Sequence, residues 1–277
     1  MEFLVEATKI NQHSNVVELG AGTGIFTRDL VAAVPGVQIV AVEPTPMGQH
    51  IGELPVAQAV PESAEHMPYV PSGKANAVFA AQSFHWFASP QSLKEIHRVL
   101  CPAGHFGVVW STTQAVEEFV APHYSESVPR QQSGLWRRAF DSAPGLFAAA
   151  ATHKHSWVHL VNASRFVNRA MSVSVIAALD AAPKRGVQQS IEQHLQKHLH
   201  WTLTAANGGA RAADLSRDEE KGHTSLKGCV AVLCDEGSAT ANHVGGLQAV
   251  QTQDGRKFKV VYSIAYETDA FVFAKQT

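Results

Sequence analysis

The chain is short of cysteine and has little excess charge of either sign. Cysteine occurs three times among 277 residues, at positions 101, 229 and 234, which is too few and too odd a number for a disulfide framework. Lys and Arg total 22 against 24 Asp and Glu, and no basic tail is present. Phosphate binding needs a concentrated cationic face, so neither nucleic acid nor an anionic membrane surface is an expected partner.

Long hydrophobic runs are also missing. No stretch reaches the roughly 18 to 20 apolar residues that are needed to span a bilayer. The first six residues carry two acids and do not begin a secretory signal. With 45% hydrophobic residues, the chain can still bury a globular core. The sequence therefore predicts a cytoplasmic protein in a reducing compartment.

The first 112 residues alternate short apolar runs with amphipathic segments, which is typical of parallel β-α-β units. Helices are expected at 27–34 and 92–100. The expected strands lack polar alternation, because helices cover both faces of a parallel sheet. These strands are expected at 15–19, 38–43, 75–81 and 105–110. The pattern predicts an α/β fold with a doubly wound, mostly parallel sheet.

The rest of the chain changes character twice. Residues 113–206 read mostly as helices that cap the sheet, with one strand at 152–161 and an apolar stripe at positions 187, 191, 195 and 199. Residues 207–257 are rich in Gly, Ala, Asp and Ser and are predicted to be a mobile insertion, apart from a short strand at 229–234. Residues 258–277 alternate in hydrophobicity and are expected to form a strand or hairpin that completes the sheet.

The most informative segment, Val16 to Thr27, is a buried strand that runs into a glycine loop and a helix. Gly20, Gly22 and Gly24 let the backbone turn sharply and approach a ligand closely. A nucleoside triphosphate loop would end in Gly-Lys-Ser/Thr, and no Lys occurs here. A dinucleotide loop is disfavoured, because Ile25 stands where a third small residue should be.

Two acids then narrow the choice of ligand. Glu43 ends the second expected strand, where a carboxylate can accept hydrogen bonds from both hydroxyls of a ribose. Glu18 precedes the glycine loop and would stand unfavourably beside the pyrophosphate of a dinucleotide. The same acid suits a ligand that carries an ammonium and a sulfonium. S-adenosylmethionine is such a ligand.

Three runs together resemble the class I S-adenosylmethionine-dependent methyltransferases of the type 11 domain group. They are Glu-Leu-Gly-Ala-Gly-Thr-Gly at 18–24, Val-Glu-Pro at 42–44 and Ala-Gln-Ser-Phe-His-Trp-Phe at 81–87. Residues 95–104 are similar to that group's helix and turn before the fifth strand. Residues 169–174 and 266–268 extend the resemblance to a trans-aconitate methyltransferase-like subgroup. The resemblance implies a seven-stranded Rossmann-like sheet, with the S-adenosylmethionine-binding core in residues 1–112 and a cap and substrate region in 113–206.

The resemblance also implies where the cofactor is held. The methionine end would lie on the glycine loop, the ribose on the acid of the second strand, the adenine on an Ala-Glu pair after the third strand, and the methyl group near residues after the fourth strand. The implied contacts are Glu18, Gly20, Ala21, Gly22, Glu43, Pro44, Ala64, Glu65, Gln82, Ser83 and Phe84. Phe84 and Trp86 could equally pack the end of the sheet, and Glu65 could be a solvated loop acid.

The acceptor side is less defined. The subgroup resemblance implies a small-molecule acceptor, with a carboxylate as one class, and Arg169 could pair with it through a bidentate contact. Trp86 is a second candidate for substrate contact. A carboxylate needs no general base, but a phenol, hydroxyl or amine would, and His85 is then the candidate base. Arg169 could instead cap its helix, and His85 could simply pack among its aromatic neighbours.

Metal binding is not expected. His194 and His198 are four residues apart on an expected helix, but no Glu follows His194 as a metalloprotease motif requires.

Only 14 residues precede the glycine strand, fewer than in most members of the group that the chain resembles, so a shortened lid over the cofactor is expected. Two alternatives therefore stay open: a cofactor-binding relative with lost or reduced activity, and a methyltransferase acting on protein or RNA.

Overall fold

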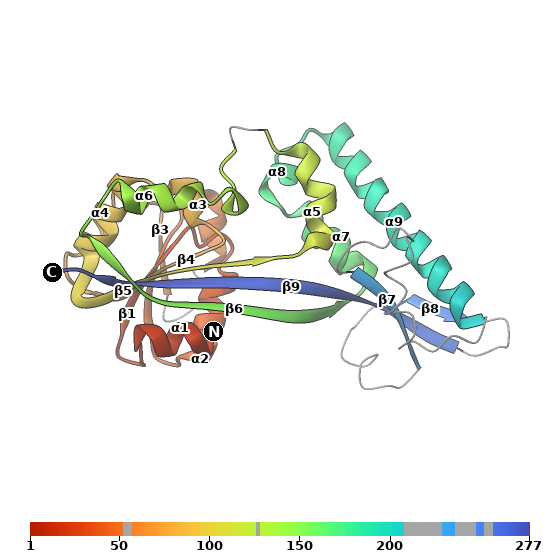
Figure 1. Cartoon of the computed structure of the whole chain (residues 1–277), viewed down its shortest axis with the longest axis horizontal. Coiled ribbons are helices and arrows are strands. Elements are labelled where there is room, and N and C mark those ends of the chain that lie inside the picture. Colours follow the sequence, from red (N-terminus) through yellow and green to blue (C-terminus); the bar gives the residue numbers. More distant parts are fainter. Residues whose placement is uncertain (52–56, 126–127, 208–228, 236–247, 252–256) are drawn as a thin grey trace. The chain divides into compact units, whose positions relative to one another are not determined.

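The computed structural model describes residues 1–51, 57–125, 128–207, 229–235, 248–251 and 257–277. The chain divides into two compact units (Figure 1). The first unit comprises Met1–Ser111, Ser127–His155 and Thr268–Thr277. The second comprises Thr112–Glu126 and Ser156–Glu267. Within the described residues, no helix combines the length and the hydrophobicity needed to cross a membrane.

The sheet has the order β3-β2-β1-β4-β5-β9-β6, with β7 and β8 paired to β9. The neighbouring pairs from β3 to β5 are parallel, whereas β7 and β8 run antiparallel to β9. The seven-stranded, mostly parallel sheet that the sequence predicts is thus confirmed. The strand bounds are β1 Asn15–Leu19, β2 Gln38–Val42, β3 Ala57–Val60, β4 Ala75–Ala81, β5 Leu100–Thr112, β6 Phe147–Val161, β7 Cys229–Asp235, β8 Gln248–Gln251 and β9 Lys257–Lys275.

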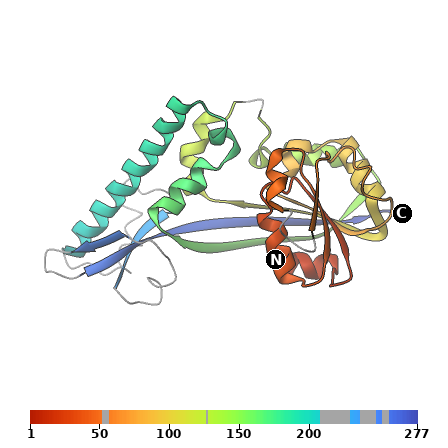
Figure 2. The same ribbon diagram turned by 180° about the vertical axis from the view of Figure 1, so that it is seen from behind.

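Neighbouring residues of a strand pack on opposite faces of this sheet, as the two-residue period of a strand requires. Val16 and Phe79 belong to a core cluster with α1 (Glu2–Thr8) and α2 (Ile25–Ala33). Val17 and Val78 belong to a second cluster with α4 (Pro90–Val99) and α6 (Arg138–Asp141). Figures 1 and 2 show these two helix pairs on opposite sides of the sheet. Both faces are therefore buried, which explains the lack of polar alternation in the strands.

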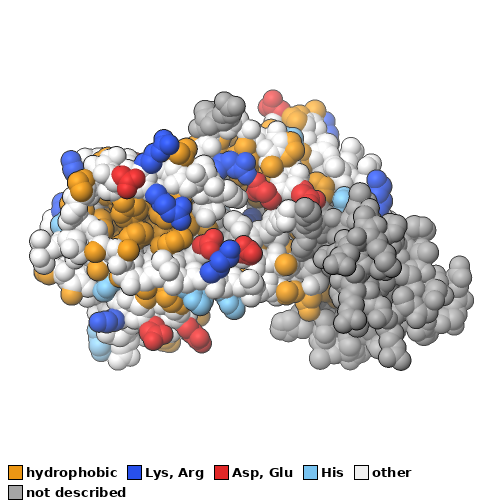
Figure 3. Space-filling view, in the orientation of Figure 1, with side chains coloured by type: hydrophobic (Ala, Val, Ile, Leu, Met, Phe, Trp, Pro, Cys, Tyr) orange, Lys and Arg blue, Asp and Glu red, His pale blue; other side chains and the backbone are white. Residues whose placement is uncertain are grey.

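The second cluster is rich in aromatic rings and extends to the surface of the first unit. Trp110 and Trp136 lie with their ring centroids 4.9 Å apart. The Arg137 guanidinium lies 4.2 Å from the ring centroid of Trp136 and 5.3 Å from that of Phe271. Figure 3 shows hydrophobic side chains gathered on this face of the unit, with Lys and Arg side chains among them. Cation–π contact gives Arg137 a favourable place over these rings.

The short elements of the first unit connect its strands at the edge where the strands end. A 3-10 helix, Pro46–Ile51, follows β2, and α3, Phe84–Phe87, follows β4. Ser89 caps α4 by accepting from the backbone N–H of Ser92, and Pro90 occupies its first turn. Two further 3-10 helices precede α6, at Gln131–Ser133 and Leu135–Arg137.

The second unit is built around α9, Ala181–Asn207. Its stripe at Val187, Ile191, Leu195 and Leu199 is buried, as the spacing of four predicts. The same cluster includes residues from β9 and from shorter helices. These helices are α5 Gln114–Val120, α7 Ala163–Met171 and α8 Ser174–Ala177, and a 3-10 helix, Ala121–His123, follows α5 outside the cluster.

Several boundaries differ from those expected from the sequence. β5 begins at Leu100 rather than 105, and β6 begins at Phe147 rather than 152. Residues 127–155, expected within the helical cap, belong to the first unit. The helices expected to cap the sheet have a hydrophobic cluster of their own in the second unit. Of the predicted insertion 207–257, residues 208–228, 236–247 and 252–256 lie outside the described residues, and 229–235 forms the expected strand.

Candidate functional site

The glycine loop after β1 has three residues with positive φ: Gly20 at 65°, Gly22 at 57° and Gly24 at 78°. A Cβ added at Gly20 would lie 2.6 Å from the Cβ of Ser83, and one added at Gly24 would lie 2.9 Å from Ile51. These two glycines are required by the protein's own packing. A Cβ at Gly22 would meet nothing within 4 Å among the described residues, so this backbone is open to a ligand there.

Glu18 lies at the end of β1 and is only 1% exposed. Its Oε2 accepts a 2.6 Å hydrogen bond from the Thr27 hydroxyl on α2. Burial raises the pKa of the carboxyl to about 7, although the Thr27 bond and the nearby Arg28 charge favour the ionised form. A ligand ammonium placed here would supply the missing countercharge. The site therefore fits the methionine end of the predicted cofactor.

Glu43 follows β2, is 5% exposed and joins the loops after two strands. Its Oε2 accepts from the Gly22 N–H at 2.8 Å. Its Oε1 accepts from the backbone N–H of Thr45 at 2.9 Å and from the Thr45 hydroxyl at 2.6 Å. An ionised carboxylate has about four acceptor positions, so capacity for a ligand hydroxyl remains. Of the neighbouring residues, Ala21 is buried beside this arrangement, whereas Pro44 is exposed.

The segment after β4 is held tightly by the protein itself. Gln82 has φ 59°, a region that non-glycine residues rarely occupy, and its side-chain amide donates to the Ser111 carbonyl at 2.6 Å. The Ser83 hydroxyl donates to the Leu19 carbonyl at 2.6 Å. Phe84 is fully buried. It contacts the rings of Phe87, Phe106, Trp136 and Phe140. These three predicted cofactor contacts thus use their side chains to shape the site.

His85 is held by an indole. The Trp110 Nε1–H donates to Nδ1 of His85 at 3.1 Å. Because an indole nitrogen can only donate, Nδ1 must be the acceptor of a neutral imidazole and Nε2 must carry the proton. Burial also lowers the pKa of His85 to about 4. This arrangement makes His85 a hydrogen-bond donor through Nε2 and argues against the general-base role expected from the sequence.

Trp86 is 48% exposed, whereas Phe84 is fully buried. The sequence left core packing and ligand contact equally possible for both residues, and their exposure in the structure differs. Phe84 packs the core. Trp86 has an exposed face at the end of β4, where a substrate contact remains a prediction.

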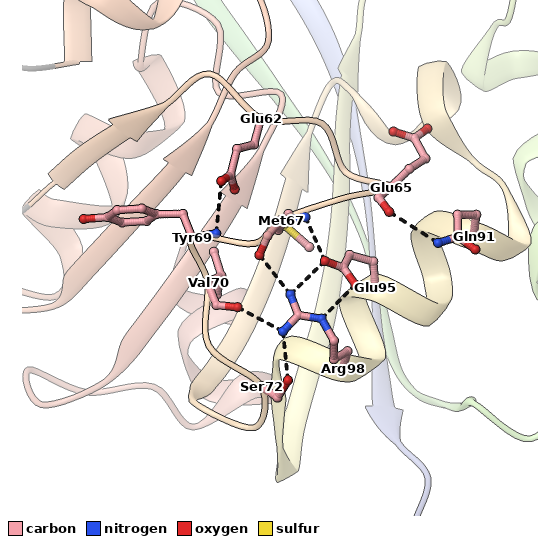
Figure 4. Close-up of polar contacts among 9 residues, drawn as sticks. All are labelled: Glu62, Glu65, Met67, Tyr69, Val70, Ser72, Gln91, Glu95 and Arg98. Atoms are coloured by element: carbon pink, nitrogen blue, oxygen red, sulfur yellow. Dashed lines mark hydrogen bonds and ion pairs between the residues drawn. The ribbon is translucent and has the colours of Figure 1, made fainter.

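Ala64 and Glu65 lie in the segment after β3, where the adenine was expected. Ala64 is buried and Glu65 is half-buried. The Glu65 carbonyl accepts a 3.4 Å bond from the Gln91 side chain, and Figure 4 shows the Glu65 carboxylate directed away from Arg98. The contacts of Arg98 with Glu95 and with the segment after β3, drawn in the same figure, were not predicted from the sequence. The signal that could have indicated them is a Glu and an Arg three residues apart on one amphipathic helix.

Arg169 lies on α7 in the second unit and is exposed. Its carbonyl accepts a 2.8 Å bond from the Ser172 hydroxyl. Its contact with an acceptor stays a prediction. The His198 side chain lies outside the described residues. Among the residues that could be searched, no three His, Cys, Asp or Glu side chains are grouped as metal ligands.

Residues 17–108 match the family described as a methyltransferase domain. An uncharacterized methyltransferase-like protein of Schizosaccharomyces pombe is 33% identical over 147 residues, which cover 50% of this chain but only 55% of that protein. An uncharacterized methyltransferase of Mycobacterium tuberculosis is 28% identical over 195 residues, covering 70% of this chain and 77% of the relative.

A solved structure from Bacillus halodurans, named for a methyltransferase, covers 100% of this chain and 98% of its own. Its TM-score is 0.51 at 17% identity, so the similarity concerns the fold. The sheet order and the glycine loop after β1 are consistent with the fold that these matches indicate. Residues 17–108 thus match a methyltransferase domain, and the fold of the chain is similar to that of a solved structure named for a methyltransferase.

Proposed function

We propose that the chain transfers a methyl group from S-adenosylmethionine to a small-molecule acceptor. The observation that carries the proposal is the open backbone at Gly22, set between the buried carboxyl groups of Glu18 and Glu43. Glu43 accepts the Gly22 N–H itself, so the acid and the open backbone are adjacent. No other described segment combines an uncovered glycine turn with two buried acids.

In this proposal two parts of the cofactor meet complementary groups. Glu18 ionises to bind the ammonium, and Glu43 accepts a ribose hydroxyl at its remaining acceptor position while it keeps the Gly22 bond. Gly22 lets the ligand approach the backbone without a Cβ between them. When bound, the cofactor supplies an electrophilic methyl group on its sulfonium. The protein's task is then alignment of the acceptor and exclusion of water.

A carboxylate is the acceptor class that the geometry after β4 favours. A carboxylate is already ionised at neutral pH and needs no base. His85 offers an Nε2–H that can donate to an acceptor oxygen, and its Nδ1 lone pair is already used by Trp110. Trp86 provides an exposed ring for the carbon skeleton.

Isothermal titration of the protein with S-adenosylmethionine, and separately with NAD, tests the cofactor assignment. We expect micromolar binding of the former alone. Glu43→Ala should weaken that binding by about one to a few kcal/mol, because ribose hydroxyls lose their acceptor. Lys94→Gln serves as a control, since Lys94 is exposed on α4 and takes no part in the hydrogen bonds described for Glu18, Glu43 or Gly22. Unchanged affinity in Glu43→Ala would place the cofactor elsewhere.

The acceptor is tested with methyl-labelled cofactor and a panel of small carboxylic acids, phenols and amines. Methyl esters are hydrolysed by mild alkali, so label in a carboxylate product should be released as volatile methanol. Alkali-stable label would contradict the carboxylate assignment. Cofactor binding without product from any metabolite mixture would indicate an inactive relative, and label in protein or RNA would indicate a macromolecular acceptor.

A further inference from the structure

Arg98 and Glu95 form a bidentate ion pair on α4. The Arg98 Nε donates to Glu95 Oε2 at 2.8 Å, and Nη2 lies 2.7 Å from Oε1. The pair lowers the pKa of Glu95 and raises that of Arg98. One turn of helix separates the two residues, so the pair is preorganised by α4 itself.

This pair holds a segment that follows β3, 26 to 31 residues earlier in the chain. Arg98 donates to the carbonyls of Met67 at 2.9 Å and Val70 at 3.0 Å, and to the hydroxyl of Ser72 at 2.9 Å. Glu95 accepts the Met67 N–H at 2.7 Å. Both polar groups of the Met67 backbone are therefore fixed by the same ion pair, as Figure 4 shows.

The held segment leaves the sheet beside the proposed cofactor site. The N–H of Glu43 donates to the carbonyl of Val60, the last residue of β3, at 3.0 Å. Ala64 and Glu65, the residues expected near the adenine, stand just before Met67 in this segment. The Glu65 carboxylate points away from Arg98 and is free of the ion pair (Figure 4). The arrangement anchors the segment to α4 without using the Glu65 carboxylate.

We propose that Glu95 and Arg98 are positioning residues, which hold the segment 61–72 so that Ala64 and Glu65 can receive the adenosine end of the cofactor. This inference rests on the proposed function. Without the guanidinium fork, the segment loses three anchoring bonds and samples conformations that do not bind. The apparent affinity then falls in proportion to the fraction of protein in the binding conformation.

Arg98→Lys tests the proposal, because it keeps the positive charge and loses the planar fork. If the segment is then competent about one tenth of the time, the dissociation constant for S-adenosylhomocysteine rises roughly tenfold in isothermal titration. Hydrogen exchange at the Met67 amide should become faster in the same variant. Lys94→Gln is the matched control, since it removes a cation from the exposed side of the same helix and should change neither quantity.

A double-mutant cycle with Glu65→Ala separates positioning from general destabilisation. If Arg98 acts through this segment, Arg98→Lys should lose most of its effect on affinity when Glu65 is already Ala. An equal loss in both backgrounds, or an unchanged affinity in Arg98→Lys alone, would overturn the inference while the proposed function stands. Failure of the unmodified protein to bind S-adenosylhomocysteine would instead reject the proposed function, and the inference with it.

Discussion

The loops that follow β1 and β4 lie at the ends of neighbouring parallel strands but are built in opposite ways. The loop after β1 leaves Gly22 uncovered and carries a buried acid whose charge has no full partner. The segment after β4 uses the side chains of Gln82, Ser83 and Phe84 within the protein. The first loop is incomplete without a ligand, whereas the second is complete without one.

This difference indicates how the two loops divide the work. A site that binds a cofactor gains affinity from groups that lack partners in the free protein, such as a buried carboxyl. A site that aligns an acceptor gains from rigidity, because misplacement by about 1 Å can cost a large factor in rate. The loops meet at one point, where Ser83 lies against Gly20.

The largest expected effect comes from Gly20. In Gly20→Ala, the new Cβ would lie 2.6 Å from Ser83 and the residue would keep φ 65°. Overpacking and backbone strain together should lower the free energy of unfolding by about 3 kcal/mol or more. Gly22→Ala has the same unfavourable φ without the clash, so it should cost only about 1 kcal/mol. Urea denaturation of both variants measures the two values.

Gly22→Ala should be the more stable of these two variants but the weaker binder of S-adenosylmethionine. The methyl group that it adds would occupy the open backbone, so the affinity should fall even though the variant folds. If Gly22→Ala binds normally, the cofactor does not cross this backbone. If it destabilises as strongly as Gly20→Ala, the loop after β1 is closed by protein contacts and the comparison fails.

Glu18 should make the stability of the free protein depend on pH. Its folded pKa of about 7 lies above the usual 4.5, so the folded state binds the proton more tightly than the unfolded state does. Stability is therefore full below about pH 4.5, falls as pH rises towards 7 and stays low above it. The total change is on the order of 3 kcal/mol. Glu18→Gln should remove this slope and be more stable than the parent at pH 8.

The same substitution should weaken cofactor binding, because a neutral amide cannot balance the ligand ammonium. Stability is measured by urea denaturation from pH 4 to pH 8, with Glu6→Gln, at an exposed position of α1, as a control for the loss of one negative charge. A Glu18→Gln variant that keeps the slope of the parent would show that another group causes it. A gain in stability together with a loss of affinity would support the view that the buried Glu18 carboxylate destabilises the free protein and that the bound ligand removes this destabilisation.

Local patterns in the sequence predicted the first of these loops well. The buried strand, the glycines and the two acids all lie within segments of a few residues, where turn geometry and burial are set by near neighbours. The parallel sheet was predictable for the same reason, since strands covered on both faces form uninterrupted apolar runs. The fold and the loop after β1 are thus encoded at short range.

The second loop depends on contacts between distant residues. A base role was possible for His85 because nothing near it in sequence indicates the indole of Trp110, 25 residues away.

The segment after β3 also depends on distant contacts. The groups that Arg98 binds lie 26 to 31 residues from it and include backbone carbonyls, which no side-chain pattern indicates. The first five residues of β6 were also missed, since this strand begins at Phe147 rather than 152, whereas β9, Lys257–Lys275, agrees with the strand or hairpin expected at 258–277.

The smallest expected effect concerns the Trp110 bond to His85. It tests whether this bond fixes the tautomer of His85 in the loop after β4. Trp110→Phe removes the indole donor, so the Nδ1–H tautomer of His85 should become populated in ¹⁵N NMR spectra at pH 7. The pKa of His85 should rise by less than about one unit, because one hydrogen bond contributes about 1 kcal/mol. Trp136→Phe is the matched control.

That control is close, because Trp136 belongs to the same aromatic cluster and its buried Nε1 has no hydrogen-bond partner in the part of the chain that the structure describes. Both substitutions replace an indole by a phenyl ring in one core, but only Trp110→Phe removes a bond to His85. An equal change in the two variants would mean that packing alone sets the tautomer. A change confined to Trp110→Phe would mean that the indole fixes the Nε2–H as a donor, and the acceptor must then arrive without a proton to lose.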